Sequence, residues 1–287
     1  MGNTQSVAWN RRWWNERYHW DDQGEQWSEP WGSAERQWFG TLLPRLQPFL
    51  PTGNGLEIAP GFGRWTEYLL PKCERLTAVD LTPKCVDACQ HRFADQTNFR
   101  CLLNDGRSLE MVSDESIDFA FSFDSLVHAE ADVLDDYLRQ LRRKLTRDGV
   151  GFIHHSNLGE YASRFWYRKI PVVRSVLKRV QRREEPATHG RTFSVTAEKF
   201  ARMAARHGLR CLSQEVINWK SPLLTDCISV FVRDDSARQG PNVVRRNDQF
   251  MDEAESVRGA PGILDVAVAS ETVVASAGGW FRYGRAA

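Results

Sequence analysis

The fold of this chain is decided by the stretch Leu56-Glu57-Ile58-Ala59-Pro60-Gly61-Phe62-Gly63-Arg64-Trp65-Thr66. A short apolar run passes there into a turn with two glycines, Gly61 and Gly63, at alternate positions. Because glycine has no Cβ atom, the backbone of such a turn approaches a ligand where another residue would clash. The stretch therefore predicts a strand that ends in a ligand-binding turn and is followed by a helix.

Further apolar runs follow, and they alternate with helical patterns, which is typical of β-α-β units in a mostly parallel sheet. Seven strands are predicted: Gly55 to Ala59, Leu76 to Asp80, Phe99 to Leu103, Ile117 to Phe123, Val150 to His155, Leu212 to Trp219 and Cys227 to Arg233. Helices are expected at Thr82 to Phe93, Ala131 to Leu145, Thr196 to His207 and Asn247 to Val257. The expected fold is α/β, a Rossmann-like seven-stranded, mostly parallel sheet with helices on both faces.

Acidic side chains stand where these strands end. Asp80 closes the second strand, 23 residues after Glu57, which is where an acid accepts both hydroxyls of a ribose. Asp105, in Asn104-Asp105-Gly106, closes the third strand. Open α/β sheets bind ligands at the carboxyl ends of their strands, so the three acids predict a nucleoside site. Each acid alone is equally well explained as a helix cap or a turn residue.

As a set, these motifs resemble those of the class I S-adenosylmethionine-dependent methyltransferases. Glu57-x-Ala59-x-Gly61-x-Gly63 looks like the first motif of that family, and Asp80 and Asn104-Asp105 look like the second and third. The resemblance covers about Trp38 to Arg233 and implies a sheet whose last strand is antiparallel. It also implies that Glu57 lies near the amino acid end of the cofactor, Asp80 on the ribose and Asp105 near the adenine. Ala59 is a departure, because the family more often has glycine there.

The candidate cofactor-binding residues are Glu57, Ala59, Gly61, Gly63, Asp80, Asn104, Asp105, Gly106 and Phe123. A nicotinamide-dependent dehydrogenase is the competing interpretation of a glycine-rich β-α-β unit. The turn does not have the pattern G-x-G-x-x-G, since Trp65 and Thr66 follow Arg64 where a third glycine allows close helix packing. S-adenosylmethionine is therefore the expected cofactor.

The acceptor chemistry is expected near the ends of the fourth and fifth strands. A hydroxyl must lose its proton when it attacks a sulfonium methyl, and histidine is the natural base near neutral pH. His128 is the first candidate, with Asp124 to orient it or the acceptor. His154 and His155 are neighbours on a strand, so they point to opposite faces, and His155 is favoured because it is nearer the strand's end. Each histidine has a structural alternative as a hydrogen-bonded residue of the core.

Three regions are expected: a tryptophan-rich arm over residues 1–38, the domain of 39–233, and a C-terminal helix with a weakly ordered tail over 234–287. Seven of the eleven tryptophans lie in the arm, which either packs against the domain or also lines its pocket. An insertion from Leu158 to Arg191 carries nine Lys and Arg against three Glu and is expected to be a basic helical cap. A solvated helix face is the alternative.

We expect methyl transfer to a hydroxyl of a sugar, glycan or natural-product acceptor that is anionic, because of the basic cap. The loose resemblance to carbohydrate-tailoring methyltransferases supports this. An N-methyltransferase acting on a small molecule and a non-catalytic cofactor-binding protein are the alternatives.

The net charge of +1 makes nucleic acid an unlikely partner. The chain has no apolar run of about 18 residues, and its six cysteines include no C-x-x-C pair. A cytoplasmic location is therefore expected. Contact with a membrane surface stays open. No metal is expected, although Asp124, His128, Glu130 and Asp132 are an alternative magnesium site.

Overall fold

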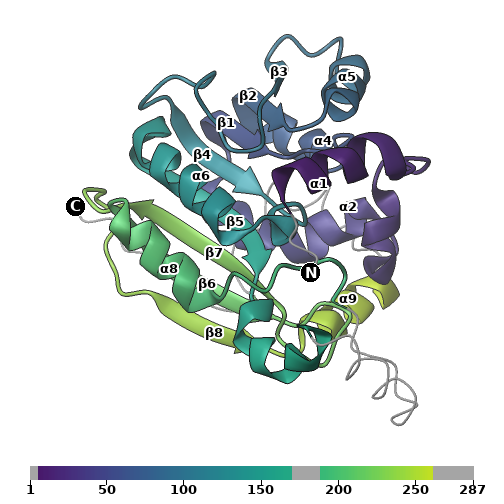
Figure 1. Cartoon of the computed structure of the whole chain (residues 1–287). Coiled ribbons are helices and arrows are strands. Elements are labelled where there is room, and N and C mark those ends of the chain that lie inside the picture. The colour runs from purple at the N-terminus through teal and green to yellow at the C-terminus, as the bar shows by residue number, and fades with distance from the viewer. Residues whose placement is uncertain (1–5, 170–187, 261–287) are drawn as a thin grey trace.

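The computed structural model describes residues 6–169 and 188–260. Within them, strands form one sheet in the order β3-β2-β1-β4-β5-β7-β6-β8 (Figure 1). The strands are β1 Thr52–Ile58, β2 Cys73–Asp80, β3 Phe99–Leu103, β4 Ile117–Ser122, β5 Leu145–Ser156, β6 Leu209–Ile217, β7 Asp226–Arg233 and β8 Val243–Asn247. All seven predicted strands are present, so the α/β, Rossmann-like fold class is confirmed.

The strands β1 to β5 run parallel to one another, whereas β7 is antiparallel to both β5 and β6. The expectation of a mostly parallel sheet with an antiparallel last strand is therefore confirmed for the first seven strands. The carboxyl ends of β1, β2, β3 and β4 meet at one edge, where Asp80 pairs with Leu103 and Ile58 with Val79. The acidic residues singled out in the sequence, Glu57, Asp80 and Asp105, lie at or near this edge.

The count of seven strands was wrong, because β8 pairs in parallel with β6 and adds an eighth. This strand lies at the edge of the sheet, and its side chains Val243 and Val244 are both 55% exposed. A strand without a buried face shows no apolar alternation, which is why the sequence did not reveal it. The following helix begins at Phe250 rather than Asn247, since Asn247 ends β8.

Helices cover both faces of the sheet. One face packs against α6 and α8, through residues such as Leu134, Leu138 and Phe200. The other face packs against α4, α9 and the helices of the N-terminal segment, around Phe119, Phe121 and Phe152. The helices are α1 Val7–Arg12, α2 Ala34–Gln37, α3 Leu43–Leu46, α4 Thr66–Leu69, α5 Pro83–Arg92, α6 Ala131–Lys144, α8 Ala197–Arg206 and α9 Phe250–Gly259. Shorter helical turns are η1 Trp13–Arg17, η2 Glu25–Trp31, η3 Trp38–Leu42, η4 Gln47–Phe49, η5 Leu70–Lys72, η6 Leu126–His128 and η7 Leu158–Lys169.

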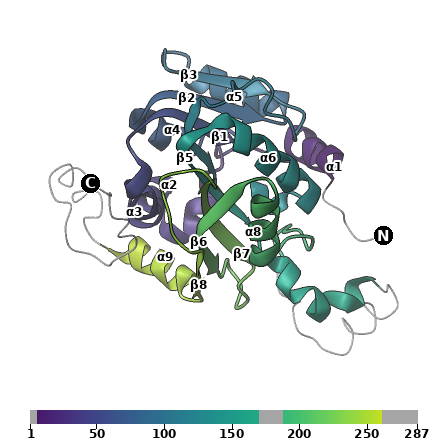
Figure 2. The same cartoon turned by 90° about the vertical axis from the view of Figure 1, so that its left-hand side faces the viewer.

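The helix α9 packs against the later part of the N-terminal segment, and Figure 2 shows α9 beside α2 and α3. The rings of Trp31 and Phe250 lie 5.9 Å apart. The guanidinium of Arg45 bonds Glu215 of β6 (2.9 Å) and Glu253 of α9 (2.8 Å). Because Trp31 is fully buried, the C-terminal helix completes the core that the N-terminal segment begins.

Two of the predicted regions reach beyond the described residues. Residues 170–187 of the basic cap and residues 261–287 of the tail lie outside them, so both predictions stay predictions. No helix in the described part of the chain is long and apolar enough to cross a membrane.

Candidate active site

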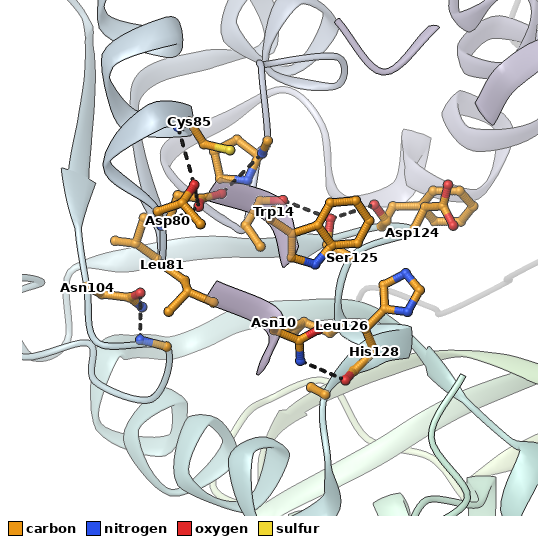
Figure 3. Close-up of a pocket in the computed structure, with 18 of the residues that line it drawn as sticks. Asn10, Trp14, Asp80, Leu81, Cys85, Asn104, Asp124, Ser125, Leu126 and His128 are labelled. Atoms are coloured by element: carbon orange, nitrogen blue, oxygen red, sulfur yellow. Dashed lines mark hydrogen bonds between the residues drawn. The ribbon is translucent and has the colours of Figure 1, made fainter. Parts of the chain in front are cut away.

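A pocket opens at the carboxyl ends of the parallel strands (Figure 3). It holds about 930 Å³ of space with its open mouth included. The lining includes many of the residues that the sequence singled out: Ala59, Gly61, Asp80, Asn104, Gly106, Phe123, Asp124 and His128. Glu57, Gly63, Asp105 and His155 are not among the residues that line it.

The glycine turn has left-handed backbone at Ala59 (φ +60°), Gly61 (φ +61°) and Gly63 (φ +85°). A Cβ atom on Gly61 would lie 2.8 Å from the ring of Trp20, and one on Gly63 would lie 2.5 Å from Phe93. The glycines are therefore required by the backbone and by the aromatic rings packed on the turn. The family more often has glycine in place of Ala59 for the same reason, since left-handed backbone is unfavourable for a residue with a Cβ.

Replacing Ala59 with glycine is expected to stabilise the protein by about 0.5–1 kcal/mol. The left-handed conformation costs alanine about 1–2 kcal/mol, and the greater flexibility of glycine in the unfolded chain takes back part of the gain. Urea unfolding of the two proteins measures the difference. As a control, Ala78→Gly, in the buried interior of β2, is expected to lower the free energy of unfolding. A loss of stability in both variants would contradict this account of the turn.

Asp80 joins the two loops that border the pocket. One carboxylate oxygen accepts hydrogen bonds from the Thr82 backbone N–H (2.8 Å) and hydroxyl (3.1 Å). The other oxygen accepts from the Gly61 N–H (3.2 Å). Burial raises the pKa of Asp80 to about 6. A carboxylate with two oxygens has lone pairs left for a ligand, so Asp80 is suited to accept hydroxyl donors.

Glu57 and Asp105 lie elsewhere than the resemblance implied. Glu57 is buried behind the turn, where it accepts a hydrogen bond from the Thr66 hydroxyl (2.6 Å), and burial raises its pKa to about 7. The exposed Asp105 caps its own turn, accepting from the N–H groups of Arg107 (2.8 Å) and Ser108 (2.6 Å). Neither side chain lines the pocket, and their expected roles beside the cofactor stay predictions.

Asn104 takes the place at the third strand end. It lines the pocket, donates to the hydroxyl of Tyr137 (3.0 Å) and accepts from the Gly106 N–H (2.9 Å). The sequence singled out both neighbours at this strand end, and in the structure Asn104 lines the pocket while Asp105 caps an exposed turn.

His128 also lines the pocket, near the ring of Trp14 (5.5 Å between centroids). Its Nδ1 lies 2.9 Å from the Gly190 carbonyl oxygen. A carbonyl only accepts, so Nδ1 carries the hydrogen and Nε2 keeps a free lone pair. Burial, and then the charge of Arg191, lower the pKa of His128 to about 4. The ring is therefore neutral at pH 7 and has the form that a general base requires.

Asp124 does not orient His128 as expected, because its carboxylate is engaged by arginines. Its Oδ2 lies 3.0 Å from Arg64, and its Oδ1 lies 3.6 Å from Arg191. Its backbone N–H donates to Nδ1 of His154 (3.1 Å). The left-handed backbone of Asp124 (φ +63°) is strained for a residue with a Cβ, and such strain is concentrated at functional sites.

The two neighbouring histidines lie on opposite faces of β5, and a catalytic role for His155 stays a prediction. His155 points away from the pocket and stacks on Phe200 of α8, 4.1 Å between centroids. Its Nε2 bonds the Ser229 hydroxyl at 2.8 Å, and burial lowers its pKa to about 3. His154 instead bonds Asp124, which lines the pocket. Alternation allowed only one of the two on that face, and the register of β5 selects His154.

Part of the chain that forms this pocket matches a known protein family. Residues 56–149 match the family model described as a methyltransferase domain. These residues form a methyltransferase domain.

The related proteins agree with this assignment. The chain is 31% identical to Nodulation protein S from Rhizobium tropici over 80 residues, which are 28% of this chain and 30% of that protein. It is 38% identical to ribosomal RNA small subunit methyltransferase A from Dehalococcoides mccartyi over 55 residues, 19% of each chain. The matches thus span less than a third of these curated relatives.

Two solved structures share the fold of the methyltransferase domain. The N-methyltransferase NodS from Bradyrhizobium japonicum, in complex with S-adenosyl-L-homocysteine, has a TM-score of 0.52 and 17% identity, covering 80% of this chain and 99% of that one. An S-adenosylmethionine-dependent methyltransferase from Clostridium acetobutylicum has a TM-score of 0.50 and 14% identity, covering 69% and 91%.

The pocket of the methyltransferase domain also contains residues that the sequence had not placed there. Trp14, Trp20 and Trp27 of the N-terminal segment line it, so this part of the arm does more than pack. Arg64 lies between the rings of Trp27 (5.2 Å) and Trp65 (4.4 Å). The density of tryptophan was the available signal, but it did not separate Trp31 in the core from Trp14 in the pocket.

Among residues 6–169 and 188–260, no three His, Cys, Asp or Glu side chains are grouped as metal ligands. Asp132, part of the alternative magnesium set, forms an ion pair with Arg107.

Proposed function

We propose that this chain transfers a methyl group from S-adenosylmethionine to a hydroxyl of a sugar, glycan or natural-product acceptor, with His128 as the base. The observation that carries the proposal is the hydrogen bond from Nδ1 of His128 to Gly190, which leaves Nε2 as an acceptor in the pocket. Deprotonation by a positioned base contributes about 10²–10⁴-fold to such a reaction.

The pocket residues fit S-adenosylmethionine. Asp80 has lone pairs for ribose hydroxyls, and Leu81, Leu126 and Val133 give the pocket an apolar wall for a flat ring. The indole N–H of Trp65, also in the lining, is buried without a hydrogen-bond partner, and a ligand acceptor would satisfy it. When bound, the cofactor supplies a methyl group on a positively charged sulfur.

We propose that the acceptor is anionic and that the protein works in the cytoplasm. The excess of Lys and Arg in the sequence from Leu158 to Arg191 supports the first proposal, because positive charge favours a negative ligand. The six cysteines are all unpaired and buried, which supports a reducing compartment.

The dependence of kcat on pH is the experiment that tests the hydroxyl acceptor. At saturating cofactor and acceptor, kcat is expected to be level between about pH 5 and 8, because the pKa of His128 is about 4 and the ring is neutral throughout. Below about pH 4, kcat falls as the ring gains its proton. Labelled methyl transfer to a panel of sugars and phenolic metabolites, read by mass spectrometry, gives the rates and the methylated atom.

An N-methyltransferase is the second candidate, and the similarity to Nodulation protein S and to the N-methyltransferase NodS favours it. An aliphatic amine with a pKa of about 10 reacts only in its neutral form. For such an acceptor kcat/KM rises with pH through 7 and 8, whereas for a hydroxyl acceptor kcat/KM, like kcat, is expected to remain level over that range. That slope, with a methylated nitrogen in the product, would replace the hydroxyl acceptor by an amine.

A further inference from the structure

We infer that Arg191 is a positioning residue that holds His128 in the tautomer with a free Nε2, acting through the Gly190 carbonyl. The inference rests on the proposed role of His128 as the base. It concerns residues far apart in the sequence, because Arg191 belongs to the segment that leads into α8 and His128 ends η6.

The side chain of Arg191 is fixed on several sides. Its Nε and Nη2 donate to the two carboxylate oxygens of Asp226, at 3.0 and 2.8 Å. Its Nη1 donates to the His189 carbonyl (3.1 Å), and its guanidinium lies over the ring of Trp219 (5.4 Å). Arg191 is 7% exposed and Asp226 is fully buried, so water does not compete for this fork. The fork anchors the backbone of residues 189–191 to the start of β7.

The backbone of this segment carries the constraint to His128. Gly190 has a left-handed φ of +71°, which orients its carbonyl oxygen 2.9 Å from Nδ1 of the histidine. On the other side of Arg191, the Thr192 N–H donates to the Val127 carbonyl (3.3 Å). The carbonyl of Gly190 is thus held between the Arg191 fork and a bond to the residue before His128. Since a carbonyl accepts only, its position selects the tautomer.

Of the charges around His128, that of Arg191 lowers the pKa of the ring, whereas those of Asp124 and Asp226 raise it. The charged groups facing it are Arg191, Asp124 and Asp226, and each carboxylate has an arginine partner, Arg64 or Arg191. Burial lowers the pKa of His128 first, and the positive charge of Arg191 lowers it further. A protonated His128 would lose its lone pair, so Arg191 protects the base in both ways.

A second histidine, His154, helps to keep Asp226 ionised beside Arg191. Its Nδ1 accepts from Asp124, so its Nε2 carries the hydrogen and faces Asp226 at 3.2 Å. Asp226 thus lies against both Arg191 and His154, and although burial alone would raise its pKa, these two residues hold that pKa well below its usual value. The carboxylate stays ionised and keeps the arginine in place.

The test is a titration of His128 by NMR in protein with ¹⁵N-labelled histidine, using His128→Asn to assign the signal. The wild type is expected to show the Nδ1–H tautomer and no protonation above about pH 5, consistent with its lowered pKa. Arg191→Gln is expected to raise the proton affinity of His128 at least 10-fold, to mix the tautomers, and to lower kcat about 10-fold or more with KM for the cofactor unchanged. Arg191→Lys keeps the charge without the fork, so it mixes the tautomers while the pKa stays low.

Two further variants guard the interpretation. The double variant Arg191→Gln with Asp226→Asn leaves no unpaired carboxylate in the core, so it is expected to fold even if Arg191→Gln alone does not. Its His128 signal is expected to titrate as in Arg191→Gln. Arg233→Gln is the matched control, because Arg233 forms a similar fork with Asp235 away from the pocket. It is expected to change stability without moving the His128 signal.

An unchanged tautomer and titration in every Arg191 variant would overturn the inference, whatever the activity. A changed titration with full activity in His128→Ala would leave the inference standing and reject His128 as the base. The two failures are therefore separable.

Discussion

Replacing His128 with alanine is expected to lower kcat for a hydroxyl acceptor by about 10²-fold or more. The reason is that the neutral ring, with Nδ1 bonded to Gly190, is the positioned proton acceptor of the proposed reaction. The KM for the cofactor is expected to change little, because His128 is assigned to the acceptor and not to the adenosine. Initial rates of labelled methyl transfer measure both constants.

His91→Ala is the control for the His128 variant, since His91 is an exposed histidine on α5 outside the pocket. It is expected to keep the wild-type rate. Full activity in His128→Ala would remove the base from the mechanism and favour an amine acceptor, which loses its proton to water before it attacks. Circular dichroism shows whether each variant keeps the fold.

The second large effect is expected at Asp80, whose replacement with asparagine should weaken binding of S-adenosylhomocysteine about 10-fold or more. Hydrogen bonds to a charged group contribute about 1.5–3 kcal/mol each, and asparagine has no charge to offer the ribose hydroxyls. It retains an oxygen that accepts from Thr82, so the loop stays capped. Calorimetric titration gives the Kd, and a thermal shift gives an independent reading.

The pH dependence of binding sharpens this prediction. The pKa of Asp80 is raised to about 6 by burial, so the wild-type affinity is expected to fall as the pH drops through 6 and the carboxylate is protonated. Asp80→Asn should lack that loss. Asp105→Asn, which keeps the turn-capping oxygen outside the pocket, is expected to bind within about twofold of wild type. Equal losses in both variants would restore Asp105 to the adenine site and contradict its placement outside the pocket.

The sequence predicted the sheet well, since strands buried on both faces read as apolar runs of the right length. It located the strand ends, and hence the edge that carries the pocket. It did not predict which side chain at each end points inward, because that depends on register with neighbouring strands. At the end of β3, Asn104 lines the pocket and Asp105 does not, and on β5 it is His154 rather than His155 that contacts Asp124.

Contacts between distant segments were also beyond the sequence. Nothing near His128 indicates that Gly190 supplies its hydrogen-bond partner, because the two residues meet only once the chain has passed through β5 and the cap. Arg64 was visible beside the glycines, but its stacking between Trp27 and Trp65 depends on how the arm folds back. Interactions of this kind are set by tertiary packing and leave no local pattern.

The meeting of Trp31 with Phe250 has a consequence for biosynthesis. Some 220 residues separate these rings, and at about 5–20 residues per second a ribosome needs about 10–40 s to make the intervening chain. During that time the nascent N-terminal tryptophans lack the helix that later covers them. Newly made chains are therefore most prone to aggregation, and most dependent on chaperones, until α9 has emerged from the ribosome.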